Sequence, residues 1–245
     1  MKKYLSLISS LLITIAVIIA AVNLGNAWKR THKGNETISV TGSAKRDFTS
    51  DLIVWRGSVS KKAPTLLLAY SSIKNDNKII KDYLLKKGVK NSEIVFEAVN
   101  IGRDYKTSFR QDGTSINEPD GYILSQNFMV SSKEVEKIGE ISRNISELID
   151  MGVELNSQNP EYYYTKLAEL KIQLIAEATK DAKMRAAQIA ENAGAKLGYL
   201  RKATMGIFQI TGQNSNEDFS YGGAFNTWSK EKSATITMRL EYAIR

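Results

Sequence analysis

The chain has no cysteine, one histidine and three prolines among its 245 residues. Without cysteine it cannot form a disulfide, a thiolate metal site or a cysteine nucleophile. The one histidine, His32, lies in a short basic segment, where a solvated side chain beside a membrane is expected. One chain therefore cannot build a histidine triad or a multi-histidine zinc site, and we expect no catalytic, cofactor-binding or metal-binding residues.

Positive charge is concentrated near the start of the chain. The formal net charge is +8, and residues 1–33 hold five basic residues and no acid. That leaves 29 basic and 26 acidic residues in 34–245, a net charge of +3. Basic residues beside an apolar run contact lipid head groups. A nucleic-acid-binding domain would instead gather positive charge on one face, so we expect no nucleic-acid partner.

The longest apolar run, residues 5–24, carries no charge. A helix of this length spans about 30 Å, which matches the hydrocarbon core of a bilayer. Two readings stay open: an uncleaved signal anchor, which the length favours, and a signal peptide cleaved near Gly25-Asn26-Ala27. We expect residues 1–33 to be an anchor in contact with membrane lipid. Residues 34–245 then form one α+β domain in the periplasm or another extracytoplasmic space.

The rest of the chain alternates strand and helix patterns. Periodicity and turn residues predict strands at 37–43, 51–59, 94–101, 121–131, 153–156, 200–211 and 232–244, and helices at 63–87, 133–151 and 162–193. Polar stretches at 102–120 and 212–229 are predicted to be loops. The order indicates antiparallel sheet with packed helices and suggests duplicated β-α-β-β units.

Each predicted helix has an apolar stripe that we expect to face the core. The stripes are Leu67, Tyr70, Ile73, Ile80 and Leu84 in the first helix, Val135, Ile138, Ile141, Ile145 and Leu148 in the second, and Leu167, Leu170, Leu174, Ala178, Ala182, Arg185 and Ile189 in the third. The third helix is rich in alanine, which favours helix formation and close packing.

Three ordered features carry a family resemblance. Residues 38–44 read ISVTGSA, Gly88-Val89 follows the first helix, and Ala178, Ala182, Ala186 and Ala190 lead to Gly194 at four-residue spacing. Over residues 36–245 the chain resembles the SIMPL-domain family of bacterial periplasmic and outer-membrane immunogenic proteins. The resemblance implies export, an α+β fold of β-α-β-β units and, from one member, assembly into a hollow oligomer. It also suggests roles in oxidative-stress protection and envelope maintenance, without established catalytic residues.

Two loops offer candidate contacts. Asp104, Asp112, Glu118 and Asp120 share one loop and could bind calcium, but interleaved basic residues favour a solvated loop. Tyr162-Tyr163-Tyr164, Phe219, Tyr221, Phe225 and Trp228 either contact a partner or fold back over the sheet edge. We expect 102–120 and 214–228 to form subunit or envelope contacts, so that deleting 214–228 weakens oligomers without changing the circular dichroism spectrum.

These features favour a non-enzymatic, membrane-anchored envelope protein that self-associates and acts by binding or scaffolding. The alternative is an envelope hydrolase that uses carboxylates, which would need two convergent, buried acids. A third possibility is a ring-shaped or pore-like assembly. No ligand can be named from the sequence.

Overall fold

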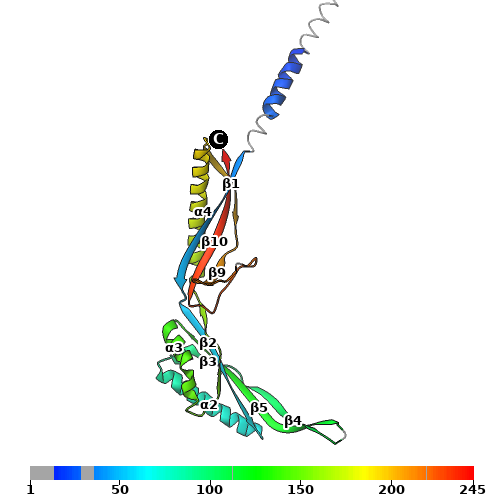
Figure 1. Cartoon of the computed structure of the whole chain (residues 1–245), viewed down its shortest axis with the longest axis vertical. Coiled ribbons are helices and arrows are strands. Elements are labelled where there is room, and N and C mark those ends of the chain that lie inside the picture. The colour runs from blue at the N-terminus through cyan, green and yellow to red at the C-terminus, as the bar shows by residue number, and fades with distance from the viewer. Residues whose placement is uncertain (1–13, 29–35, 112, 219) are drawn as a thin grey trace, which may run out of the picture. The chain divides into compact units, whose positions relative to one another are not determined.

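The computed structural model describes residues 14–28, 36–111, 113–218 and 220–245 (Figure 1). The predictions for His32, Asp112, Phe219 and residues 5–13 fall outside the described residues. Residues 14–28 form a helix with exposed apolar side chains. In the part of the chain described here, no helix is long and apolar enough to cross a membrane.

The remaining residues form an α+β fold with antiparallel sheets, as predicted. Its strands are β1(Thr37–Thr49), β2(Leu52–Ala63), β3(Ile94–Phe96), β4(Asn100–Phe109), β5(Ser115–Ser132), β6(Leu155–Ser157), β7(Glu161–Tyr163), β8(Leu197–Met205), β9(Gln209–Gly212) and β10(Glu231–Ile244). Its labelled helices are α2(Leu66–Lys86), α3(Val135–Arg143) and α4(Leu167–Asn192), with short 3-10 turns at Asn91–Glu93 and Ile145–Leu148.

The chain divides into two compact units. Unit 1 comprises residues 1–45, 171–208 and 235–245, and unit 2 comprises 46–170 and 209–234. One sheet has the order β1-β10-β8, with β9 beside β10, and the other has the order β3-β5-β2-β6, with β4 beside β5 and β7 beside β2. The division falls within β1, α4 and β10, so neither unit is one continuous stretch of chain.

Unit 1 is a sheet with the alanine-rich helix α4 on one face (Figure 1). Ala178, Ala182, Ala186 and Ala190 are buried on α4. Gly42 of β1 lies directly on this stripe, because a Cβ atom added there would come within 2.3 Å of the Ala182 backbone nitrogen. The predicted alanine stripe is therefore confirmed, but Arg185 and Ile189 were wrongly placed on it and lie exposed.

Hydrogen bonds also close unit 1. The Ser43 N–H of β1 donates to Oδ2 of Asp181 on α4 at 2.9 Å. At the ends of the sheet, the Ile244 N–H donates to the Glu36 carbonyl at 3.2 Å, and Lys196 and Arg245 exchange two backbone hydrogen bonds. The start of β1 and the end of β10 are thereby fixed side by side.

Unit 2 is a sheet with helices on one face. Ile53, Trp55 and Val59 of β2 point into a core that α2 and α3 complete, and alternate residues of β2 point to the opposite face. Trp55 meets Phe128 of β5 edge to face at 5.4 Å between ring centroids. The predicted stripe of the second helix is confirmed, since all its members are buried. That helix nevertheless breaks at Asn144, where a 3-10 turn follows α3.

Two predictions about helices in unit 2 were wrong. Leu67 and Tyr70 were expected in the core but are exposed, 77% and 48%. Residues 162–164 were assigned to a helix, but they lie in or next to strand β7, which pairs with β2. Tyrosine suits a half-buried strand, and this long-range pairing prevails over helix propensity.

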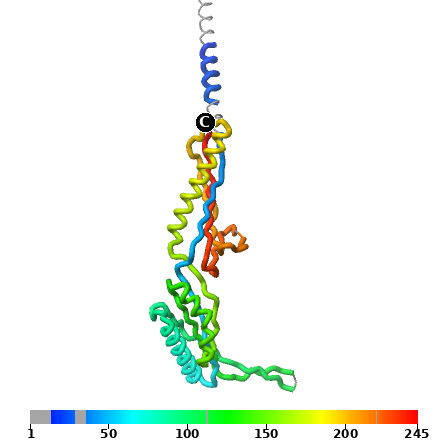
Figure 2. Tube along the Cα trace, turned by 60° about the vertical axis from the view of Figure 1, so that its left-hand side comes forward, coloured from blue at the N-terminus to red at the C-terminus, as the bar shows by residue number. Residues whose placement is uncertain are grey.

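The segment 102–120 is not a loop but belongs to a hairpin of β4 and β5. The β2–β5 ladder ends at Ala63↔Tyr122, while β4 and β5 stay paired from Tyr105↔Pro119 to Phe109↔Ser115. We call residues 104–120 the arm. Figure 2 shows it projecting from the rest of unit 2 as a two-stranded ribbon.

Candidate functional site

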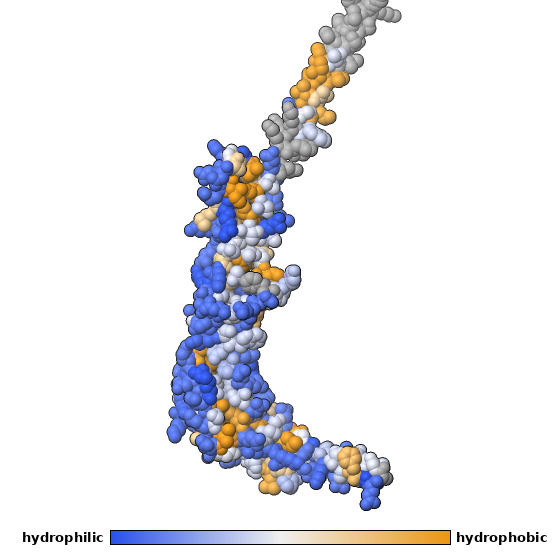
Figure 3. All heavy atoms as spheres, viewed as in Figure 1, coloured by the Kyte–Doolittle hydropathy of each residue, from blue (hydrophilic) through white to orange (hydrophobic). Residues whose placement is uncertain are grey.

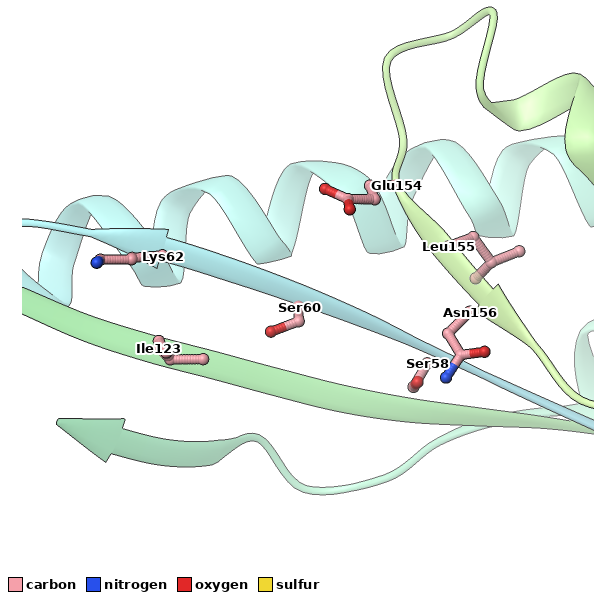
Figure 4. Close-up of a pocket in the computed structure, with 7 residues that line it drawn as sticks. All are labelled: Ser58, Ser60, Lys62, Ile123, Glu154, Leu155 and Asn156. Carbon is pink, nitrogen blue, oxygen red and sulfur yellow. The ribbon is translucent and has the colours of Figure 1, made fainter. Parts of the chain in front are cut away.

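The edge groove is a polar hollow of about 430 Å³ at one margin of the unit 2 sheet. It is lined by Ser58, Ser60, Lys62, Ile123, Glu154, Leu155 and Asn156. Figure 4 shows that its residues come from β2, from β5, from β6 and from Glu154 just before β6. The groove exists because β6 is short: it pairs with β2 only from Gly57↔Ser157 to Val59↔Leu155, while β2 continues to Ala63.

Ion pairs fix the two lysines of β2, and of these Lys62 lines the groove. The Lys62 Nζ atom donates to Asp104 and, at 2.5 Å, to Oδ2 of Asp120. These hydrogen bonds raise the pKa of Lys62, and the bond from Lys62 lowers the pKa of Asp104. Two of the four acids considered for calcium thus bind a lysine instead of forming an empty cation site.

Lys61 points to the other face of β2. Its Nζ atom lies 3.0 Å from Oδ2 of Asp76 on α2, which is buried. The carboxylate of Glu154 is exposed, and no ion pair or hydrogen bond joins it to another described residue. The groove and the groups bonded to it therefore combine one lysine, Lys62, with three carboxylates, those of Asp104, Asp120 and Glu154.

The apolar groove lies at the base of the arm. It has a volume of about 500 Å³ and is lined by Leu66, Leu67, Tyr70, Val99, Ile101 and Leu124. Leu67 is 77% exposed and Ile101 is 61% exposed. The stripe of the first predicted helix thus continues past the core onto the surface, where contiguous apolar side chains commonly mark an interaction site.

The arm carries more exposed aromatic surface. Tyr105 and Phe109, on β4, are 51% and 75% exposed. They are four residues apart on one strand and so point to the same face of the ribbon. A two-stranded ribbon with no other cover is only marginally stable in water, so this arm gains most from a partner that packs on it.

The aromatic residues considered from the sequence divide into two groups. Tyr162, Tyr163 and Tyr164 are half-buried beside β2, as expected for residues that cover a sheet edge. Burial raises the pKa of Tyr163. Tyr221, Phe225 and Trp228 are exposed, and their contact with a partner stays a prediction.

A buried polar network holds the loop that carries Tyr221 and Trp228. The Lys232 Nζ atom, on a side chain only 2% exposed, donates to the backbone and side-chain oxygens of Asn226 at 2.5 and 3.2 Å. Glu217 accepts from Asn226, from the Trp228 indole at 3.1 Å and from the Gly212 N–H at 3.1 Å. Burial lowers the pKa of Lys232 to about 8.

The sequence reasoning missed the edge groove. It ended the strand at Val59, whereas β2 runs four residues further, and two of these residues, Ser60 and Lys62, line the groove. In the structure Val59 and Lys61 face the core while Ser58, Ser60 and Lys62 face the open side, but the sequence Ser60-Lys61-Lys62 has no alternation of apolar and polar residues that would extend the predicted strand.

The fold defines a class of two-layer α+β proteins in which helices cover one face of an antiparallel sheet. Within that class, a family model described as "SIMPL: Protein of unknown function (DUF541)" matches residues 38–240. The chain therefore belongs to the SIMPL family. No curated protein matches the chain.

Proposed function

We propose that this chain is a membrane-anchored envelope protein that acts without catalysis, by binding or scaffolding, and associates with copies of itself through the arm and the apolar groove. The observation that carries the proposal is the exposed apolar surface of unit 2. Phe109, Tyr105 and Leu67 are each at least half exposed, and burying them in a complex would release water from a large apolar area.

The anchoring part of the proposal rests on the N-terminal segment. Figure 3 shows the helix at residues 14–28 as mainly apolar on its visible face. Its members Val17, Ile18, Ile19 and Val22 are each more than half exposed. The uncharged run extends in sequence from Leu24 back to Leu5, long enough to reach across a bilayer. Export of residues 34–245 to the periplasm, or to another extracytoplasmic space, follows from this anchor.

A duplicated β-α-β-β unit is the finer form of the fold proposal. In chain order, β2, α2, β3 and β5 follow one another as strand, helix, strand and strand, with β4 inserted as part of the arm. Around the other sheet, β1, α4, β8 and β10 give the same series of strand, helix, strand and strand, with β9 inserted and with most of unit 2 lying between β1 and α4 in the chain. The repetition of order supports duplication.

The carboxylate-dependent hydrolase is the weaker candidate. It needs two acids that converge in a buried pocket, which raises one pKa to make a general acid. Asp76 is the buried acid among the described residues, and its neighbour is Lys61 rather than a second acid. This arrangement is typical of a structural ion pair and favours the binding role.

The self-association test uses the full chain in detergent micelles. We expect wild-type protein to form oligomers at about 10 µM, because interfaces of standard size have dissociation constants from micromolar to picomolar. Replacing Tyr105, Phe109 and Leu67 by serine should weaken association at least tenfold, measured by sedimentation equilibrium. The matched control is Tyr221→Ser, which removes a fully exposed aromatic residue from the other loop.

Three results would count against the proposal. The first is a wild-type monomer. The second is an arm variant with the wild-type mass. The third is a loss of association in Tyr221→Ser alone, which would move the contact to the 214–228 loop. The substitution Tyr221→Ser tests this loop more specifically than deletion of 214–228. The deletion would also remove Asn226 and leave the buried Lys232 amine without its acceptors.

A stress-related role is the last part of the proposal, and it rests on the family resemblance. Cells that lack this chain should then survive peroxide less well than cells complemented with it. Complementation with the serine-substituted arm variant tests whether any protection depends on association.

A further inference from the structure

One side of β2 is an open strand edge beyond Val59. The Gln158 N–H donates to the Arg56 carbonyl at 3.0 Å, which places the backbone groups of Arg56 on the β6 side of β2. Because backbone groups alternate sides along a strand, those of Ser58, Ser60 and Lys62 point the same way. Ser58 is opposite Asn156 in β6, but the ladder ends one residue later.

Ser60 and Lys62 therefore each present a backbone N–H and a C=O toward the edge groove. In the described part of the chain, no strand lies on that side of β2 beyond Val59. Both residues are exposed. On its other side, β2 stays paired with β5 through Ala63↔Tyr122, so the open edge belongs to a strand that is already held straight.

This geometry is the one used in strand addition. An extended peptide that continues the line of β6 can exchange main-chain hydrogen bonds with Ser60 and Lys62 without displacing any described strand. Open edges are often guarded by lysine. Here the Lys62 ammonium is drawn toward Asp104 and Asp120, away from the edge.

Charge indicates which peptide fits. Asp104, Asp120 and Glu154 outnumber Lys62, the lysine that lines the groove, while Lys61 and Asp76 pair on the opposite face of β2. Glu154 has no described ion pair at the end of the groove where β6 begins. A basic peptide gains Coulomb attraction to this surface, whereas an acidic one is repelled.

We propose that the edge groove binds an extended, basic segment of a partner protein, which adds to β2 beside Ser60 and Lys62 as a short antiparallel strand. This inference rests on the proposed binding role but is independent of self-association through the arm. The partner is defined by its main chain and positive charge, and small side chains suit positions that face Ser58 and Ser60.

The test measures fluorescence anisotropy with the full chain in detergent micelles. The probe is a labelled six-residue peptide of alternating lysine and threonine, with both ends blocked. One control peptide carries glutamate in place of lysine. Two further control peptides carry N-methyl groups on alternate residues, one at the odd positions and the other at the even positions. Each keeps the charge of the probe but loses the N–H donors along one edge of the peptide strand.

The protein variants separate backbone from side chain. Ser60→Pro removes the N–H that points into the groove and leaves the β5 ladder intact, because the backbone groups of Ser60 face away from β5. Ser60→Ala is its matched control, since it keeps the N–H. Glu154→Gln removes one acid of the groove without changing its size.

We expect the basic peptide to bind the wild type and Ser60→Ala within twofold of each other. Ser60→Pro and backbone methylation should each weaken binding at least tenfold, and Glu154→Gln about threefold. Equal binding of methylated and unmethylated peptides, or of the acidic and basic peptides, would overturn the proposal. If Ser60→Pro fails to fold, the binding of the methylated peptides to the wild-type protein still tests whether main-chain hydrogen bonds are required.

A second copy is the competing occupant of the edge. Loss of oligomer mass in Ser60→Pro, together with no binding of the basic peptide, would assign the edge to a copy of this chain and refute the peptide site. Unchanged oligomer mass in the serine-substituted arm variant would count against self-association through the arm and leave the peptide result untouched.

Discussion

Replacing Gly42 by alanine adds one methyl group where β1 packs on α4. The added Cβ atom would lie 2.3 Å from the Ala182 nitrogen, 2.4 Å from the Ala178 carbonyl oxygen and 2.7 Å from the Ala182 Cα atom. All three are backbone atoms of a helix, so no side-chain rotation relieves the clash. The helix must move about 1 Å away from the sheet to restore ordinary van der Waals distances.

That movement loosens a closely packed interface. Ala178, Ala182 and Ala186 have no exposed surface, and their contacts with the sheet would open together. Overpacking typically costs about 1–3 kcal/mol, and the rigid backbone contacts place Gly42→Ala near 3 kcal/mol. For a chain of this size, such a loss lowers the melting temperature by about 6–12 °C.

Thermal unfolding followed by circular dichroism at 222 nm measures this effect. Gly102→Ala is the matched control, because its Cβ atom would meet only the Ile123 carbonyl at 3.5 Å, an ordinary contact. Ala182→Gly should not rescue Gly42→Ala, since the clash is with backbone rather than with the Ala182 methyl group. A melting temperature within 2 °C of wild type would refute this reasoning.

Three further predictions concern charged groups. Burial lowers the pKa of Lys232 to about 8, so between pH 8 and 10.5 the unfolded chain holds a proton that the folded chain has lost. In urea titrations, the free energy of unfolding of the wild type should rise by about 2 kcal/mol from pH 8 to 10 relative to Lys232→Met. Parallel pH profiles of the two proteins would contradict this prediction. The Ser43 N–H and then Arg185 lower the pKa of Asp181, so its contribution is present above about pH 4 and lost as the pH falls further. Asp181→Asn should therefore lose less stability than wild type between pH 5 and 3 in the same titration, and an equal loss would exclude this role. Asp76→Ala leaves the Lys61 ammonium without its partner and should lower the free energy of unfolding by about 2 kcal/mol, less than for a fully buried pair because Lys61 reaches solvent. In urea unfolding, the double variant Asp76→Ala with Lys61→Met should recover most of that stability. No recovery would mean that the unpaired lysine is not the cause of the loss.

The helices were the most predictable part of this fold. The stripe of Val135, Ile138 and Ile141 and the four-residue spacing of alanines on α4 each record which helix face meets a sheet. That information is local, since it depends only on the period of 3.6 residues per turn. The ends of the helices were less predictable. Tyr162 and Tyr163 were expected in a helix but lie in β7, which pairs with β2 more than 100 residues earlier in the chain.

The arm and the edge groove could not be predicted in the same way. In the arm both faces of the ribbon are exposed, so its sequence shows no alternation of apolar and polar residues. Lys106 and Glu118 are an example, since they lie opposite each other in the β4–β5 ladder. The groove depends on the residue at which β6 separates from β2. Val153, two residues before β6, is buried in the core of unit 2, so the chain turns away from β2 at this point. No pattern within β2 itself reports that its neighbour is three residues long.

The hydrogen bond from the Ile244 N–H to the Glu36 carbonyl has a practical consequence for engineering. Because β1 begins where β10 finishes, a short linker can join residue 245 to residue 36 without crossing either sheet. New ends could then be opened at the tip of the arm, between β4 and β5, to give a circular permutant. In such a chain the two strands of the arm would no longer be tethered by a turn, and each could carry a reporter of whatever binds there.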